Sequence, residues 1–451
     1  MSFSVEGKRV TVAGAARSGL AAAELLARRG ARVTLSDTRR DLAAAEPLRA
    51  LGVRLEAGGH QAETFDQADL IVLSPGVPAD QPVVLNARHR GVPVIAEIDL
   101  ASRWLRGRVI AITGTKGKST TTTLTGRLLE AAGLKVSVGG NIGAPLSAQV
   151  AASTPETFHV VETSSFQLEQ IETFHPWIAV MLNFSPDHLD RHPTVEAYGA
   201  AKARIFENQE TSDWAVVNAD DPFVLELAKR GRAQIRRFAL RQALEEGTVV
   251  EDGWIVSRDR ESSRRLVPID AIHLLGPHLV PDVMAAATVG AIAGAGPSAM
   301  TAAVEAFHGL EHAMEMVGEI DGVRFVNDSK ATNVASALKS IESFDRDLVP
   351  IMGGRFKGGD LRVLREPLRA RAEAVITIGE ARPLFREALA GAVDVREAGS
   401  LAEAVTDAYG LARPSGVVLL APACASFDMF SDYAARGRAF KEEVARLRTA
   451  T

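Results

Sequence analysis

One stretch of this sequence limits the possible folds more than any other. An apolar run at 109–113 ends in a turn that contains Gly114 and Gly117, and apolar residues then recur at helical spacing as far as Leu129. We therefore predict a strand, a tight turn and a helix in this order. Glycines let the backbone approach phosphate oxygens closely, and the first N–H groups of a helix point at a bound anion.

The turn predicts a phosphate-binding loop for ATP. Its pattern is G-x-x-G-K-S-T over 114–120, which is one glycine short of the full motif because Ile112 stands at the earlier glycine position. An ordinary turn with a surface lysine is the alternative, but glycines, lysine and hydroxyls all fall in register behind a strand. Lysine can reach terminal phosphates, and the hydroxyls can bind Mg²⁺. The residues expected at ATP are Gly114, Thr115, Lys116, Gly117, Lys118, Ser119 and Thr120.

Length and composition restrict the class of protein. A chain of 451 residues can hold roughly two to four domains, each with its own core. A hydrophobic content of 46%, a charged content of 24% and a net charge of −5 indicate a soluble globular protein without a general nucleic-acid-binding surface. No apolar run has the length of a membrane span, and the single cysteine, Cys424, excludes an intrachain disulfide and a cysteine zinc cluster. We expect a cytoplasmic protein with no membrane or nucleic-acid partner.

The first part of the chain alternates short apolar strands with helical stretches, which predicts a parallel, Rossmann-like sheet. The turn at 14–19 resembles a dinucleotide fingerprint without its middle glycine, because Ala16 stands there, and Asp37 follows the second strand, where an acid can bind ribose. A NAD site and a UDP-sugar site are both compatible with this pattern. The expected elements are strands at 8–13, 32–36, 68–73 and 93–95 and a helix at 18–29.

Two further α/β segments follow, and we predict domains at 1–98, 99–307 and 308–451. The middle domain is an expected ATPase-type sheet with an antiparallel patch beside it, at about 232–275, where turn signals separate short β-like runs. The last domain again has a dinucleotide-fold pattern. The expected strands are 158–162, 178–183 and 215–218 in the middle domain and 323–326, 348–352, 374–378 and 417–420 in the last, where helices are expected at 401–412 and 433–447.

Polar residues follow the middle strands, at the edge of an open α/β sheet where ligands bind. Glu162 could be a magnesium ligand beside the phosphate loop, because Mg²⁺ takes few protein carboxylates and keeps waters and phosphate oxygens. His188, in a polar loop, could be a hydrogen-bonding residue, a metal ligand or a base. Lys202 would by default be a surface lysine on a helix.

These motifs resemble those of the Mur ligases, the ATP-dependent amide-forming ligases of peptidoglycan synthesis, over essentially the whole chain. Within this family they are most similar to those of members that add D-glutamate. Many ATPases share the phosphate loop, whereas NDSKATN at 327–333 and PACASFD at 422–428 are much more specific. The matching motifs, in order, are the phosphate loop, GGNIG at 139–143, ETSSFQLE at 162–169, NFSPDHLDRH at 183–192, NADD at 218–221, NDSKATN at 327–333 and PACASFD at 422–428.

The resemblance implies a three-domain monomer that binds a UDP moiety, ATP and an amino acid in successive domains. It implies that the alanine carboxylate of UDP-N-acetylmuramoyl-L-alanine attacks the γ-phosphate of ATP, and that the D-glutamate amine then attacks the acyl phosphate. It also implies two Mg²⁺ ions and a carbamylated Lys202. Lys330 and Lys357 in the last domain suit D-glutamate as the incoming amino acid, since a dicarboxylic substrate needs two cationic or hydrogen-bonding partners.

The residues implied by the resemblance fall into four groups. The UDP substrate would contact Arg17, Ser18, Asp37, Thr38, Arg39, Ser74, Pro75, Gly76 and Asn141. The catalytic residues would be Lys118, Glu162, His188 and Lys202, with Asp328 as a further ATP contact. The magnesium ligands would be Ser119, Thr120, Glu162, His188 and Lys202. D-Glutamate would contact Lys330, Thr332, Lys357, Ser426 and Phe427.

Three positions depart from the family pattern. The family reads G-x-H-N-x-x-N in its central domain, and both asparagines are replaced at 276–282, by Leu279 and Asp282. The family's last domain opens with His-Arg, whereas Ala313 follows His312 here. Since that arginine faces the nucleotide phosphates, we expect weak ATP binding and slow turnover. A folylpolyglutamate-type ligase is disfavoured by the separate first domain, and a nucleotide-sugar-binding homologue without ligase activity stays open.

Overall fold

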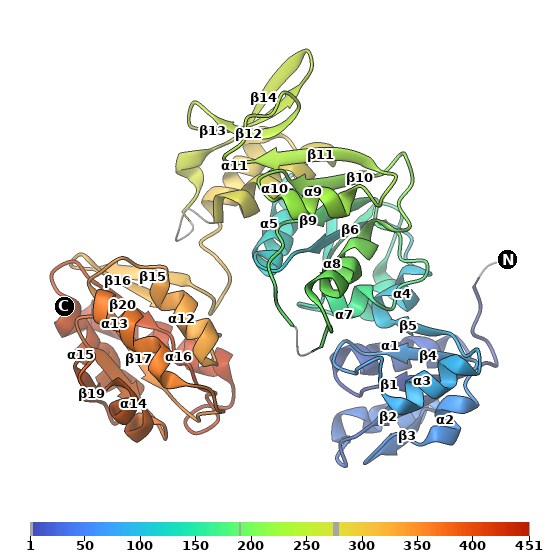
Figure 1. Cartoon of the computed structure of the whole chain (residues 1–451), viewed down its shortest axis with the longest axis horizontal. Helices are drawn as coiled ribbons and strands as arrows, with labels where there is room; N and C mark the ends of the chain where they lie inside the picture. The colour runs from blue at the N-terminus through green and yellow to red at the C-terminus, as the bar shows by residue number, and fades with distance from the viewer. Residues whose placement is uncertain (1–2, 189–190, 274–278, 451) are drawn as a thin grey trace. The chain divides into compact units, whose positions relative to one another are not determined.

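The computed structural model of the chain describes residues 3–188, 191–273 and 279–450 (Figure 1). Among these residues, one compact unit ends at Phe307 and a second begins at His308. The described strands form three sheets, two in the first unit and one in the second, and helices accompany each sheet. This confirms the predicted α/β class. No helix in the described part of the chain is both long and apolar enough to cross a membrane.

The first sheet is parallel throughout, with the strand order β3-β2-β1-β4-β5. Its central strands are short runs of buried aliphatic residues, as expected for a parallel sheet covered on both faces. The four predicted strands are confirmed, with ends shifted by two residues or fewer. The elements are β1 (Arg9–Ala13), α1 (Arg17–Arg28), β2 (Arg32–Asp37), β3 (Arg54–Ala57), α2 (Ala62–Asp66), β4 (Leu70–Leu73), α3 (Pro82–His89), β5 (Val94–Ala96) and α4 (Glu97–Ser102).

Within the described residues the second sheet has nine strands, and it carries the phosphate loop. Its strands are β6 (Arg108–Thr113), β7 (Lys135–Gly140), β8 (Thr157–Glu162), β9 (Ile178–Met181), β10 (Trp214–Asn218), β11 (Gln234–Ala239), β12 (Gly247–Glu251), β13 (Trp254–Asp259) and β14 (Ser262–Pro268). Its helices are α5 (Lys118–Ala131), α6 (Leu146–Gln149), α7 (Ser165–Leu168), α8 (Val195–Ala203), α9 (Pro222–Ala228), α10 (Val280–Ile292) and α11 (Pro297–Glu305). The order is β14-β13-β12-β11-β10-β9-β6-β8-β7.

The predicted antiparallel patch is confirmed at β12–β14, but it continues the main sheet and does not lie beside it. Strand β11 pairs parallel with β10, and β12 pairs parallel with β11, so the chain continues the main sheet before β13 and β14 turn antiparallel. The patch is therefore the edge of the main sheet and not a separate layer. Helix α10 packs against α5 and is apolar on nearly every side, which explains why it is buried between α5 and the sheet strands.

The third sheet forms the core of the second unit. Its strands are β15 (Glu315–Ile320), β16 (Val323–Asn327), β17 (Leu348–Gly353), β18 (Val375–Ile378), β19 (Val395–Glu397) and β20 (Val417–Leu420), in the order β15-β16-β20-β17-β18-β19. Only the pairing of β15 with β16 is antiparallel among the described strands of this sheet. Apolar clusters cover both of its faces. The helices are α12 (Val334–Glu342), α13 (Arg365–Arg371), α14 (Arg382–Leu389), α15 (Leu401–Ala412) and α16 (Tyr433–Ala450).

Candidate active site

The phosphate loop joins β6 to α5 in the way that the sequence predicts. Gly117, directly before the helix, has a φ of 79°, a left-handed conformation that glycine adopts without steric cost. The Lys118 ammonium donates to the carbonyls of Gly114 and Thr115, at 3.1 and 3.0 Å. The lysine is thus folded over the loop whose backbone N–H groups open toward an anion.

Three polar side chains meet beside the loop. Asn141 and Glu162 lie at the ends of the neighbouring strands β7 and β8, and Ser119 lies in the first turn of α5. The Ser119 hydroxyl donates to Glu162 Oε2 at 2.6 Å, and the Asn141 amide donates to Glu162 Oε1 at 2.7 Å. Glu162 ends β8, which pairs with β6, and is buried. Among the described residues no three His, Cys, Asp or Glu side chains converge as a metal site. A carboxylate with one hydroxyl fits Mg²⁺ that takes its other ligands from phosphate and water.

Lys202 does not lie on the surface, so its default interpretation was wrong. Its side chain is 1% exposed on α8, and its amine donates to the Gly114 carbonyl at 2.7 Å. Burial and, as a smaller contribution, the nearby Lys118 charge lower the pKa of Lys202 to about 7. The amine also lies 4.7 Å from the centre of the Tyr198 ring. The phosphate loop and α8 are therefore joined through a lysine that readily becomes neutral.

An aromatic cluster surrounds His188. The His188 ring meets the Phe166 ring edge-on at 5.1 Å, and Phe166 stacks on His192 at 5.5 Å. His192 is buried, with Nε2 at 2.9 Å from Ser165 Oγ and a ring 5.2 Å from that of Tyr198. Sequence reasoning missed the other members of this cluster, Phe166, His192 and Tyr198. The only available signal for the second histidine was its place four residues after His188.

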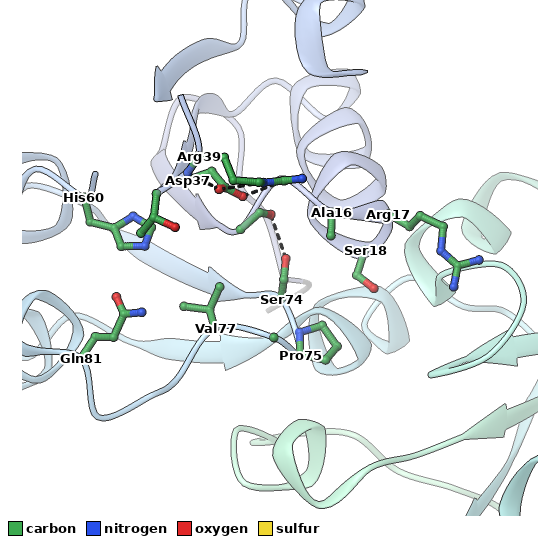
Figure 2. A pocket seen from close by; sticks show the side chains of 13 residues that line it. Ala16, Arg17, Ser18, Asp37, Arg39, His60, Ser74, Pro75, Val77 and Gln81 are labelled. Atoms are coloured by element: carbon green, nitrogen blue, oxygen red, sulfur yellow. Dashed lines mark hydrogen bonds and ion pairs between the residues drawn. The ribbon is translucent and has the colours of Figure 1, made fainter. Parts of the chain in front are cut away.

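A cavity of about 400 Å³ lies at the carboxyl ends of β1, β2 and β4, the switch point of the first sheet (Figure 2). Asn141, which was predicted to contact the UDP substrate, does not line this cavity. Its amide donates to Glu162 instead. His60 and Gln81 also line the cavity and were not predicted, because no motif marks them. The predicted residues that line it are Arg17, Ser18, Asp37, Thr38, Arg39, Ser74, Pro75 and Gly76.

Asp37 is fully engaged inside this cavity. Its Oδ1 accepts from the Arg39 backbone N–H and from Arg39 Nε, and its Oδ2 accepts from the Ala15 N–H and from Arg39 Nη2, all within 3.0 Å. Partial burial raises the pKa of this carboxyl, but the hydrogen bonds from Arg39 and Ala15 outweigh burial and bring the pKa to about 2. Asp37 therefore holds the first turn and Arg39 in place.

The residues predicted for D-glutamate lie in the second unit. Lys330, Lys357 and Phe427 are exposed, Thr332 is half-buried and Ser426 is buried. Asp328, predicted for ATP, is buried and accepts hydrogen bonds from the Ser340 hydroxyl and the Met314 N–H. Burial raises the pKa of Asp328.

Arg436, which sequence reasoning missed, joins two motifs of this unit. It is buried on α16, and its Nη2 donates to the carbonyls of Ser329 and Cys424 at 3.0 and 3.2 Å. Each of these two residues belongs to one of the motifs that carry the predicted D-glutamate contacts. An arginine in a C-terminal helix carries no sequence signal for such a role.

The positions that depart from the family pattern lie in both units. Asp282, in the first turn of α10, is 4% exposed and lies against the phosphate loop, where a Cβ on Gly117 would be 2.2 Å from Asp282 Oδ1. Burial raises the pKa of Asp282 to about 7. Leu279 is the residue before α10, and Ala313 belongs to the second unit. The predictions at 276–278 and at 189–190 lie outside the described residues.

Three family models match successive parts of the chain. Residues 8–96 match the Mur ligase MurD-like N-terminal domain, residues 112–290 the Mur ligase middle domain, and residues 312–424 the Mur ligase glutamate ligase domain.

The chain is also similar to individual proteins. The UDP-N-acetylmuramoylalanine–D-glutamate ligase of Koribacter versatilis is 45% identical over 446 residues, 98% of each chain. That of Acidobacterium capsulatum is 47% identical over 445 residues, 98% of this chain and 96% of the relative. The solved structure of UDP-N-acetylmuramate-alanine ligase MurC from Thermotoga maritima has a TM-score of 0.56 at 18% identity, and the match covers 98% of this chain and 100% of that chain. This last likeness concerns the fold.

Proposed function

The chain belongs to the Mur ligase family and is an ATP-dependent ligase that forms a peptide bond, and we propose that it joins D-glutamate to UDP-N-acetylmuramoyl-L-alanine. One observation favours a ligase over a nucleotide-sugar-binding protein. The Ser119–Glu162 pair lies at the helix end of the phosphate loop, and the buried Lys202 amine donates to Gly114 at its strand end. A nucleotide-sugar-binding protein without ligase activity would have no use for this arrangement.

We propose a reaction in two steps. A substrate carboxylate oxygen bonds to the γ-phosphorus of ATP and ADP leaves; the amine nitrogen of D-glutamate then bonds to the acyl carbon, phosphate leaves, and the nitrogen loses a proton. The carboxylate needs this activation because it is a poor electrophile. Lys118, whose ammonium donates to the Gly114 and Thr115 carbonyls of the loop, supplies positive charge where the phosphoryl oxygens gather negative charge.

The residues of the central domain also fit magnesium and a carbamate. Bound Mg²⁺ would neutralise phosphate charge, and Ser119, Thr120, Glu162 and His188 are the proposed side chains that hold it. A lysine adds CO₂ through its neutral amine, with loss of a proton, and burial favours the neutral amine of Lys202. The carbamate oxygens would extend the same set of ligands.

We propose that the second unit supplies D-glutamate. Lys330 and Lys357 are exposed cations in the loops after β16 and β17 and suit a substrate with two carboxylates. Thr332, Ser426 and Phe427 stay predicted contacts. Because the Asp328 carboxyl is buried against Ser340 and Met314, its predicted contact with ATP would need that carboxyl to leave its present partners.

The domain boundaries at 98 and 307, the monomeric state, the cytoplasmic location and the absence of nucleic-acid and membrane partners stay predictions. The matched spans and the three sheets support the division into three domains.

Phosphate release with each substrate omitted in turn tests the function. Purified protein should release phosphate from ATP only when UDP-N-acetylmuramoyl-L-alanine and D-glutamate are both present. Equal release with L-glutamate, or with a folate substrate in place of the nucleotide sugar, would contradict the assignment.

A further inference from the structure

The cavity of the first sheet has two ends that differ in chemistry. Figure 2 shows Arg17 and Ser18 at one end and His60 and Gln81 at the other. Arg17 is the first residue of the twelve-residue helix α1, whose N-terminal N–H groups favour an anion. The diphosphate of a UDP substrate would therefore occupy the α1 end, which leaves the end with His60 and Gln81 for the base.

Asp37, the acid expected at the base or ribose, already accepts hydrogen bonds from within the protein. A carboxylate has about four lone-pair directions, and Asp37 accepts four hydrogen bonds from Arg39 and Ala15. It could accept a further donor only by releasing one of these. The base therefore needs another acceptor in the cavity.

His60 has an acceptor whose position follows from its hydrogen bonds. The buried Ser36 hydroxyl lies 2.7 Å from Glu56 Oε1 and 2.8 Å from His60 Nδ1. Ser36 has one hydrogen, and the Glu56 carboxylate can only accept, so the serine donates to Glu56. Its oxygen must then accept from His60 Nδ1–H.

This chain of bonds leaves Nε2 of His60 without a proton. Burial lowers the pKa of His60, which favours the neutral ring, and a neutral ring with a proton on Nδ1 has a lone pair on Nε2. The loop that carries His60 is held by two contacts. The Gly59 N–H donates to the Asp37 carbonyl, and the centres of the Phe65 and His60 rings lie 5.3 Å apart. His60 thus presents a fixed acceptor on the cavity wall.

We propose that His60 selects the uracil base: its Nε2 accepts the N3–H of uracil, and the Gln81 amide serves a neighbouring uracil carbonyl. Uracil offers a donor at N3 between two carbonyl acceptors, which complements this pair. Cytosine carries a lone pair at N3, which would face the lone pair of Nε2. The inference deepens the proposed function, on which it rests, and assigns the discrimination between uridine and cytidine nucleotides to one side chain.

Binding of UDP and CDP to the full chain, measured by calorimetry, tests this. Wild type should bind UDP more tightly than CDP, and His60→Ala should lower that preference about tenfold, mainly by weakening UDP, as expected for one lost hydrogen bond. The matched control is His89→Ala, since His89 is exposed on α3 outside the cavity, and its preference should equal that of wild type. Ser36→Ala, which removes the acceptor that fixes the proton on Nδ1, should lower the preference by a smaller factor.

Two results separate the possible failures. If His60→Ala binds UDP and CDP with the same loss, or keeps the wild-type preference, His60 does not read the base and the inference is overturned. Fluorescent ATP analogue binding should be unchanged in this variant, which excludes general unfolding. If wild type binds neither UDP nor CDP, both the proposed function and the inference fail.

Discussion

Replacing Asp282 by asparagine should stabilise the first unit, and more so at alkaline pH. An exposed aspartate has a pKa near 3.8, and burial against the phosphate loop raises the pKa of Asp282 to about 7. Between these values the folded protein keeps a proton that the unfolded chain has released, so the free energy of unfolding falls as pH rises through this window. At roughly 1.36 kcal/mol per pH unit, the loss between about pH 5 and about pH 8 is of the order of 3 kcal/mol.

Asparagine has the same shape and does not titrate, so Asp282→Asn should escape this loss. Urea unfolding at about pH 5 and about pH 8, followed by tryptophan fluorescence, measures the difference. The four tryptophans, Trp104, Trp177, Trp214 and Trp254, all precede residue 307, so the signal reports the first unit. The gain of the variant over wild type should grow by up to roughly 3 kcal/mol from the acidic to the alkaline condition.

The matched control is Glu245→Gln, because Glu245 is exposed in the same unit. Its difference from wild type should not depend on pH. A gain for Asp282→Asn that is equal at both pH values would refute the reasoning, since it would mean that this carboxyl does not change its protonation on folding in this range. ATP affinity should also rise in the variant at alkaline pH, where wild type places a negative charge beside the loop.

Three further predictions concern catalysis. Lys202→Ala should abolish nearly all activity, and short carboxylic acids should partly restore it by supplying the missing carbamate oxygens; wild-type activity in the variant would contradict the proposed role. Removal of Lys330 or Lys357 should raise the apparent KM for D-glutamate much more than that for ATP, and the reverse pattern would assign these lysines to the nucleotide. Ala313→Arg combined with Leu279→Asn should raise kcat/KM for ATP about tenfold or more, and no increase would mean that other groups already fill these roles.

Local sequence signals were enough for the phosphate loop and the central strands. The glycines around the loop and Lys118 act within a few residues of one another, and buried parallel strands are continuous apolar runs. The edge strands β3 and β19 were missed because each is short and carries charged residues, which removes the apolar pattern. The turn residues at 74–76 were predicted from the resemblance to contact the UDP substrate, and they line the cavity of the first sheet.

Burial of polar side chains could not be predicted from the sequence. Lys202 lies on a helix with no strong apolar face, and only the packing of α8 on the phosphate loop buries its amine. The environment of Asp282 depends on α10 lying against α5, two helices that are far apart in the sequence. His60 follows two glycines in a loop, and its role depends on the bonds between Ser36 and Glu56. In each case the decisive contact is long-range.

The most direct test of the ligase reaction follows an oxygen atom. UDP-N-acetylmuramoyl-L-alanine labelled with ¹⁸O in its alanine carboxylate is incubated with ATP, D-glutamate and the protein, and the released phosphate is analysed by mass spectrometry. The proposed acyl phosphate transfers one carboxylate oxygen to phosphorus, so each phosphate released should carry one ¹⁸O from fully labelled substrate. Phosphate without label would mean that water attacks ATP, and label in AMP would mean that the carboxylate is activated as an adenylate; either result would contradict the proposed reaction.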